Sequence, residues 1–202
     1  MCIRDRNKAL ALVDTQYFGW LNADDCYLPG RIGTLLQQTK VTPVPSIVYG
    51  DYQIIDKAGR LIKRRPQPSF NYSDCLYSYL TIQNCAAIFH TERCRSTGGF
   101  DRSLDFCMDY DLVLRMASDG PVRHVREYTG CFRHHEDAKT ARLQRVCELE
   151  TRNLRIKYSG RSARELQWRY WLGTVRVAGR MIAQGCIGAR LFNTGSTEIV
   201  ES

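Results

Sequence analysis

The sequence predicts an α/β fold in which a mixed sheet is flanked by helices. Short apolar runs that are typical of buried strands alternate along the 202 residues with stretches of helical periodicity. Hydrophobic residues make up 44% of the chain and charged residues 25%, which is an ordinary globular composition and excludes extensive disorder. A cluster of acidic residues follows the first apolar run. Open α/β sheets bind their ligands at the C-terminal ends of their strands, which is where this cluster would lie.

The first part of the chain predicts a helix, a buried strand and a second helix. Residues 7–13 have a helical composition, and the aromatic and apolar run at residues 17–21 predicts a buried strand. We expect this strand to be central in the sheet and to carry Asp24 and Asp25 at its C-terminal end. A helix at about residues 31–38 follows a Pro-Gly pair.

The middle of the chain predicts further strands. Residues 46–51 form a second apolar run, and the Asp-Lys-Ala-Gly turn at residues 56–59 predicts a hairpin that leads into residues 60–63. A third apolar run lies at residues 85–89.

The last part is mainly helical. Residues 109–118 have helical periodicity that ends at a Gly-Pro pair, and residues 122–132 return as a strand. Two helices follow, at about residues 138–158 and 163–184, and a Ser-Gly pair separates them.

Most of the positive charge lies near the C-terminus. Residues 139–202 hold 12 basic and 5 acidic side chains, whereas residues 1–138 hold 17 and 16. The basic residues are not interleaved with aromatic ones as in nucleic-acid platforms, so we expect no nucleic-acid partner. No stretch of eighteen apolar residues predicts a membrane-spanning helix. Nine cysteines without a C-x-x-C pair favour free thiols in a reducing cytoplasm over a disulfide framework or a zinc site.

Asp24 and Asp25 form the first candidate site. Adjacent carboxylates repel each other, and a hard divalent cation that also binds substrate phosphates is a common compensation. The alternative, which the pair alone favours, is a solvated turn or a helix cap.

Asp109 and Asp111 begin the helix predicted at residues 109–118. Residues i and i+2 point in different directions on a helix, so only one of the two can face a common site. A carboxylate at a helix start beside a cleft is a plausible general base. The spacing alone favours the alternative, which is helix capping.

Arg133 and His135 follow the last predicted strand. Arginine suits a diphosphate, and histidine suits a phosphate or a metal. The alternative is an exposed charged loop.

These motifs come in a fixed order along the chain. They are the acidic segment at residues 18–30, the hairpin at 48–59, the apolar strand at 83–89, the Gly-Gly-Phe-Asp turn and Asp-Tyr-Asp helix at 98–115, and the Phe-Arg-His-His loop at 132–135. In this order they resemble the family-2 glycosyltransferases, which are inverting enzymes of GT-A fold. The resemblance covers about residues 7–140.

The resemblance implies a donor site. Asp24 and Asp25, with His135, would hold Mg²⁺ or Mn²⁺ against the diphosphate of a nucleotide-sugar donor. Asn22, which stands at the first acidic place of the family's D-x-D motif, would contact the donor together with Asp24. Arg133 and His135 would neutralise the leaving diphosphate.

The resemblance also implies the chemistry and the acceptor. Asp109 would deprotonate an acceptor hydroxyl, although Met108 stands where the family often has glutamate. The acceptor would be a carbohydrate or a lipid-linked sugar in bacterial polysaccharide or glycolipid assembly.

The N-terminus departs from the family. Residues 1–6 resemble the translation of a sequencing adapter, so we expect native sequence to begin near Asn7 and the family's first nucleotide-binding strand-helix unit to be missing. Residues 7–137 would then be a partial catalytic domain, followed by basic helices at 138–192 and a polar tail at 193–202. We expect this fragment to be inactive and prone to aggregation.

The helix predicted at residues 163–184 is amphipathic. Trp168 and Trp171 fall on one face, and Arg169 and Arg176 fall on another. One interpretation is peripheral contact with the inner face of the plasma membrane. The other is a helix packed across the catalytic domain, with the tryptophans in the core and the arginines in solvent.

A second class of function remains open, in which the chain is a non-catalytic scaffold or binding module that uses its basic C-terminal helices. The position of Asp25, Asp109 and His135 in one cleft would favour catalysis.

Overall fold

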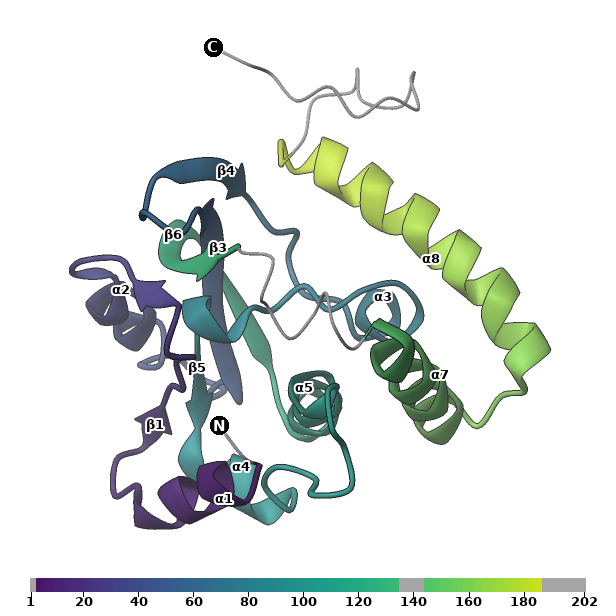
Figure 1. Ribbon diagram of the computed structural model, residues 1–202, viewed down its shortest axis with the longest axis horizontal. Coiled ribbons are helices and arrows are strands. Elements are labelled where there is room, and N and C mark those ends of the chain that lie inside the picture. The colour runs from purple at the N-terminus through teal and green to yellow at the C-terminus, as the bar shows by residue number, and fades with distance from the viewer. Residues whose placement is uncertain (1–2, 135–143, 187–202) are drawn as a thin grey trace.

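The computed structural model describes residues 3–134 and 144–186, which build a mixed six-stranded sheet with helices on both faces (Figure 1). The strands lie in the order β1-β5-β3-β6-β2, and β4 pairs with β3 off this path. Their bounds are β1 Tyr17–Phe18, β2 Cys26–Tyr27, β3 Ile47–Ile55, β4 Leu61–Arg65, β5 Ala87–His90 and β6 Val122–Arg133. β3 and β6 are parallel, and the other pairs are antiparallel. The predicted α/β fold with a mixed sheet is confirmed.

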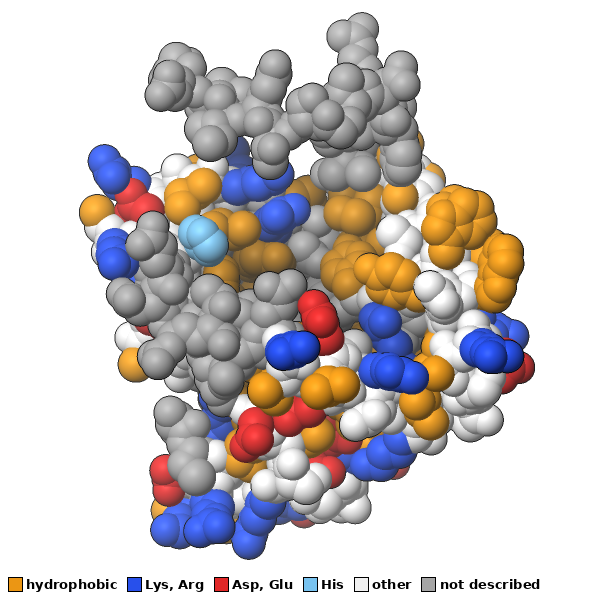
Figure 2. Space-filling view, turned by 45° about the vertical axis from the view of Figure 1, so that its right-hand side comes forward, with side chains coloured by type: hydrophobic (Ala, Val, Ile, Leu, Met, Phe, Trp, Pro, Cys, Tyr) orange, Lys and Arg blue, Asp and Glu red, His pale blue; other side chains and the backbone are white. Residues whose placement is uncertain are grey.

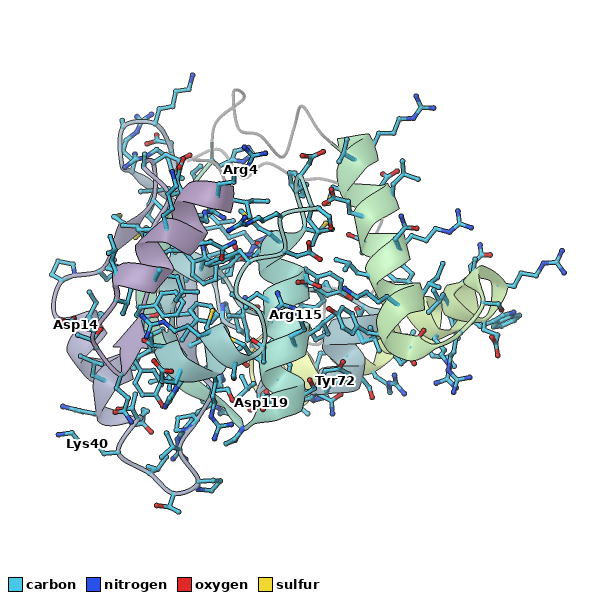
Figure 3. The ribbon with its side chains drawn as sticks, turned by 90° about the horizontal axis from the view of Figure 1, so that it is seen from below. Arg4, Asp14, Lys40, Tyr72, Arg115 and Asp119 are labelled. Carbon is cyan, nitrogen blue, oxygen red and sulfur yellow. The ribbon has the colours of Figure 1, made fainter. Side chains whose placement is uncertain are left out.

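Helices cover the two faces because side chains alternate along the central strand β3. Val48 packs toward Leu35 on one face, whereas Ile47 and Tyr49 belong to the larger core on the other face, together with Leu112. The helices are α1 Ile3–Leu12, α2 Arg31–Gln37, α3 Tyr72–Tyr77, α4 Thr91–Ser96, α5 Met108–Asp119, α7 Gln144–Ser159, α8 Ala163–Ala183 and the 3-10 turn η1 Asn84–Ala86. Seen from below, α5 with Arg115 lies between α1 and α7 (Figure 3).

The predicted first strand differs from the observed one. Only Tyr17 and Phe18 pair with β5, and β1 lies at an edge of the described sheet, so the prediction of a central strand at residues 17–21 is wrong. The chain leaves the sheet because Trp20 stacks on Phe89, with ring centroids 4.3 Å apart, and meets Phe100 edge-on. The two aspartates therefore lie in and just after a turn that leads directly into β2, at the opposite edge of the sheet.

The first helix begins earlier than predicted, at Ile3 rather than near Asn7. Asn7 anchors α1 to the Gly-Gly-Phe turn, because its amide donates to the Phe100 carbonyl (2.7 Å) and its Oδ1 accepts from the Phe100 N–H (2.9 Å). Gly99 in this turn has φ +66°, and a Cβ there would lie 2.7 Å from the Asn7 side chain. The turn therefore needs glycine for both its backbone angle and its close approach to α1.

Most other predicted elements are confirmed, and four short ones were missed, namely β2, α3, η1 and α4. β3 and β4 form the hairpin, and α5, β6 and α8 lie where predicted. The start of the helix expected at residues 138–158 lies outside the described residues. The missed α3 had a local signal, since the Asn71 side chain caps it by accepting from the Asp74 N–H at 3.0 Å. The missed η1 and α4 are also short.

Helix α8 does not pack with its tryptophan face, which is the face that a core helix would bury. Trp168 is 74% exposed and Trp171 61%, so the interpretation that places the tryptophans in the core is wrong. Leu166, Gly173 and Val177 are the buried residues instead. Within residues 3–134 and 144–186, no helix is both long and apolar enough to cross a membrane.

Candidate active site

The acidic turn between β1 and β2 is held by its own neighbours. Asp25 is buried, and its Oδ1 accepts from the Arg133 backbone N–H (2.9 Å) while its Oδ2 accepts from the Asn22 amide (3.0 Å). Arg133 comes from the end of β6, which pairs with β2. The antiparallel pairing of two distant segments thus brings together four of the predicted donor-site residues, including Asp24.

The Arg133 guanidinium fastens this turn to the β3–β4 hairpin. Its Nε donates to the Asp24 carbonyl (2.8 Å), and its Nη1 donates to the carbonyls of Asp56 (2.7 Å) and Lys57 (3.0 Å). Arginine carries five N–H donors, and these bonds to described residues use three of them. His135, the other residue predicted to contact the diphosphate, lies outside the described residues.

Burial raises the pKa of the Asp25 carboxyl, because the protein interior disfavours its charge. The hydrogen bonds from Arg133 and Asn22 oppose this rise, while the neighbouring Asp24 adds to it. Each oxygen of Asp25 accepts one bond and keeps a second lone pair, so the carboxylate can still ligate a cation. Among the described residues, no three His, Cys, Asp or Glu side chains form a group that could hold a metal alone.

Asp109 lies in the first turn of α5, and its Oδ1 accepts from the Tyr110 N–H (2.8 Å). The backbone that leads into this helix is clamped by Glu150 of α7, whose carboxylate accepts from the N–H groups of Asp105, Phe106 and Cys107 at 2.7–2.9 Å. The position of Asp109 therefore depends on α7 as well as on α5. Sequence reasoning missed Glu150, because nothing local links it to a segment 43–45 residues earlier.

Arg6 connects the two predicted sites. Its Nη2 donates to Asn22 Oδ1 (3.2 Å), its Nη1 contacts the Met108 sulfur (2.8 Å), and its charge interacts with Asp109. The side chain is only 8% exposed, and burial lowers its pKa. Arg6 belongs to residues 1–6, which we expect to be non-native, so these contacts by themselves assign no site residue.

Asp109 lines a cavity of about 280 Å³, near the lower end of the range of about 300–1,000 Å³ that is typical of ligand pockets. The other lining residues come from α5, α7, the loop after α3 and the loop before α5: Ser78, Tyr79, Leu80, Phe106, Cys107, Tyr110, Cys147, Thr151 and Arg155. Among the described residues that line this cavity, Asp24 and Asp25 are absent, so the expectation that Asp25 and Asp109 line one cleft is not confirmed. The link between the two sites runs through Arg6.

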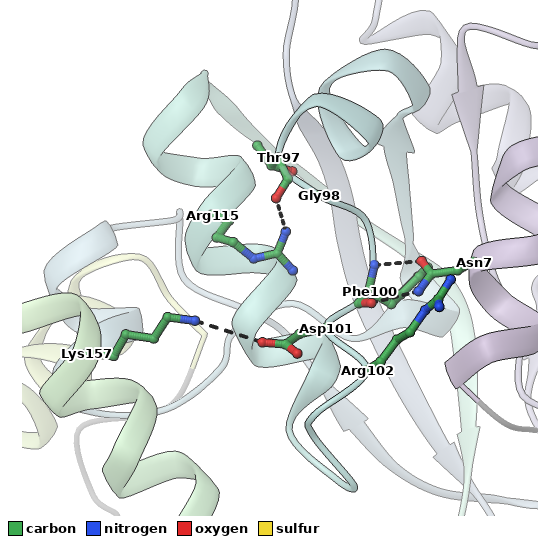
Figure 4. Close-up of a pocket in the computed structure, with 8 residues that line it drawn as sticks. All are labelled: Asn7, Thr97, Gly98, Phe100, Asp101, Arg102, Arg115 and Lys157. Carbon is green, nitrogen blue, oxygen red and sulfur yellow. Dashed lines mark hydrogen bonds and ion pairs between the residues drawn. The ribbon is translucent and has the colours of Figure 1, made fainter.

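Asp111 has the structural role predicted for it. It is fully buried, and its Oδ2 accepts from Arg115 Nε (2.9 Å) and Nη2 (2.5 Å), while its Oδ1 accepts from the Tyr158 hydroxyl (2.5 Å). The prediction that Asp111 serves a salt bridge is confirmed. Arg115 also lines a polar pocket of about 470 Å³ with Lys157 and Asp101, and this pocket contains none of the predicted site residues (Figure 4).

Burial also raises the pKa of Asp109, and this shift can be tested by measuring thermal stability as a function of pH. The pKa of Asp109 is higher in the folded chain than in the unfolded chain, where it is near 3.8. The contribution of this group to stability is therefore fully present below pH 3.8, where the carboxyl is neutral in both states. The stabilisation is lost as the pH rises through the raised pKa. At neutral pH we expect Asp109→Asn to melt a few degrees higher than wild type, since 1 kcal/mol corresponds to roughly 2–4 °C for a chain of this size.

The measurement is thermal unfolding of both proteins across the acidic to neutral range. The difference in melting temperature should be small below the ordinary carboxyl pKa and should grow with pH. A variant that melts lower than wild type at neutral pH would contradict this expectation.

The chain is related in sequence to glycosyltransferases. An uncharacterized glycosyltransferase of Rickettsia conorii is 25% identical over 144 residues, which cover 68% of this chain and 24% of that protein. Chondroitin synthase of Escherichia coli is 28% identical over 126 residues, covering 60% of this chain and 18% of that protein. An uncharacterized glycosyltransferase of Rickettsia typhi is 30% identical over 132 residues, covering 62% of this chain and 41% of that protein. No protein-family profile matches the chain.

Solved structures share the fold. The crystal structure of S. aureus TarS residues 1–349 superposes with a TM-score of 0.50 at 9% identity, and the match covers 96% of this chain and 55% of that one. This chain therefore spans less than a quarter of the first two relatives named above and about half of this structure.

Proposed function

We propose that this chain is the part of a longer inverting glycosyltransferase that carries the general base and the metal-binding turn. The enzyme moves a sugar from a nucleotide-sugar donor to the hydroxyl of a carbohydrate or lipid-linked acceptor in bacterial polysaccharide or glycolipid assembly. The observation that supports this most is the position of Asp109 at the wall of a cavity, in a chain where the pairing of β2 with β6 also brings Asn22, Asp25 and Arg133 together. The sequence relationship to glycosyltransferases, one of them a chondroitin synthase, supports the same class of reaction.

In this proposal Asp109 is the general base. Burial raises its pKa, so its carboxylate holds a proton more readily than an exposed one. The positive charge of Arg6 opposes this rise and favours the ionised carboxylate that a base needs. The cavity beside Asp109 would hold the acceptor with its hydroxyl next to that carboxylate.

In the same proposal Asp24 and Asp25 bind the donor side. Their carboxylates and the Asn22 amide offer the oxygen ligands that Mg²⁺ and Mn²⁺ accept. His135 would complete this set. Bound there, the cation would neutralise charge on the leaving diphosphate. Arg133 holds the Asp24 backbone and would contact the same diphosphate.

The test uses the full-length protein that contains this segment. It is incubated with a panel of nucleotide sugars and oligosaccharide acceptors, and the anomeric configuration of the product is read by NMR. Transfer with inversion supports the proposal. A folded full-length protein that binds no nucleotide sugar and transfers none would leave the non-catalytic scaffold as the better interpretation.

We further expect the metal requirement to depend on the donor. Two carboxylates beside an amide form a weak site for Mg²⁺, which keeps its waters and prefers phosphate oxygens. Chelation with EDTA should abolish transfer and leave the thermal transition of the protein unchanged. Loss of the transition on chelation would show that the metal is structural and would contradict this.

A further inference from the structure

Helix α8 presents an apolar stripe to solvent. Trp168, Trp171, Leu172 and Val175 are 74%, 61%, 47% and 52% exposed. Their spacing of i, i+3, i+4 and i+7 puts them on one face of the helix, over about 10 Å of its length. Figure 2 shows large hydrophobic side chains gathered on the right-hand side of the molecule, where α8 comes forward.

The face of α8 opposite the stripe makes close contacts with the rest of the protein. These contacts fix how the helix is turned about its axis and keep the stripe in solvent. A Cβ on Gly173 would lie 3.3 Å from the Tyr77 carbonyl, which shows how closely the helix approaches α3. Arg180 donates to Asp74 and to the Ser69 carbonyl, both at 2.5 Å. Turning the stripe inward would break these contacts.

Positive charge borders the stripe at its N-terminal end. Arg164 lies one helical turn before Trp168, and with Arg152 and Arg155 it lines a pocket of about 470 Å³. The described lining of this pocket holds three arginines and no acidic residue. Glu165, the acidic residue of α8, is committed to the Ser162 capping box.

Aromatic rings beside arginines match the interface of an anionic bilayer. Tryptophan settles at the level of the lipid headgroups, and arginine binds their phosphates in a bidentate manner. We propose that α8 docks the protein onto an anionic phospholipid bilayer, with the stripe at headgroup level and a lipid phosphate in the arginine pocket. The excess of 12 basic over 5 acidic residues in 139–202 has the matching sign.

Docking in this way would bring lipid close to the candidate active site. Arg155 lines both the arginine pocket and the cavity of Asp109, donates to the Ser78 carbonyl (2.5 Å) and stacks on Tyr170. A phosphate-linked lipid held on one side of Arg155 would therefore present its attached sugar near Asp109. This second step rests on the proposed function, whereas docking itself does not.

The test is flotation of the full-length protein with vesicles of phosphatidylcholine alone and of phosphatidylcholine mixed with phosphatidylglycerol. We expect binding to the anionic vesicles and a blue shift of tryptophan fluorescence. The double variant Trp168→Ser/Trp171→Ser should bind at least about tenfold more weakly. Its matched control is Leu149→Ser, which removes an exposed leucine (58%) from α7 outside the stripe and should bind like wild type.

The arginines are tested separately. Arg152→Gln and Arg164→Gln should each weaken binding to anionic vesicles by roughly fivefold, and high salt should remove this difference. Arg60→Gln, at the exposed β3–β4 hairpin, is the charge-matched control. Equal flotation of wild type and the double tryptophan variant would overturn the proposal. A change of that variant from dimer to monomer in sedimentation would assign the stripe to a second copy of the chain, and would also overturn it. Neither outcome depends on sugar transfer.

Discussion

Asp109→Asn in the full-length protein is expected to lower turnover at least about a hundredfold while nucleotide-sugar binding stays nearly unchanged. The amide cannot take the proton of the acceptor hydroxyl, but it keeps the shape of the side chain and the contact with the Tyr110 N–H. The measurement is kcat for transfer together with the Kd of the donor by calorimetry.

The control for this experiment lies on the same helix. Asp119 is at the other end of α5, and its carboxylate makes a 3.5 Å contact with Arg93 at the surface. Asp119→Asn should therefore leave turnover close to that of wild type. A similar loss in both variants, or a loss that appears only in donor binding, would remove Asp109 from the role of base.

The second large effect concerns stability. Asp111→Ala is expected to lower the free energy of unfolding by about 3–5 kcal/mol, because it leaves the charge of the largely buried Arg115 without its partner. The Tyr158 hydroxyl loses its acceptor as well. Since whole domains are stable by only about 5–15 kcal/mol, a large part of the population should unfold under mild denaturant.

A matched ion pair separates burial from charge in this measurement. Asp56 pairs with Arg60 at the same i, i+4 spacing, but the Arg60 side chain is 82% exposed, whereas the Arg115 side chain is 18% exposed. Arg60→Ala, which removes the pair but keeps the backbone N–H that bonds Asp56, should leave the denaturant midpoint nearly unchanged, because exposed pairs contribute little. Equal shifts of the denaturant midpoint in the two variants would show that burial does not strengthen the Asp111–Arg115 pair.

The features that the sequence predicted correctly depend on neighbouring residues. The hairpin at Asp56–Gly59 follows from turn chemistry within four residues, and the Arg60 N–H closes it by donating to Asp56 Oδ1 at 2.9 Å. The separate orientations of Asp109 and Asp111 follow from helix geometry alone. The proximity of Asn22 to Asp25 likewise follows from one short turn.

Other features depended on contacts between distant segments. The first strand stops at Phe18 because Trp20 stacks on Phe89, and no local pattern specifies that partner. The Glu150 carboxylate reaches the backbone of Asp105 and Cys107 across 45 and 43 residues, so this support of the α5 start exists only in the folded chain.

The orientation of α8 shows the same division most clearly. The sequence by itself determined that residues 163–184 form an amphipathic helix with a tryptophan face and an arginine face. It could not determine which face packs, because both interpretations satisfy the same periodicity. The tertiary structure decided it through the close approach of Gly173 to α3 and the ion pair of Arg180 with Asp74. A small residue and a paired charge outweighed apolarity at this interface, since they allow the backbones to approach and satisfy a buried carboxylate.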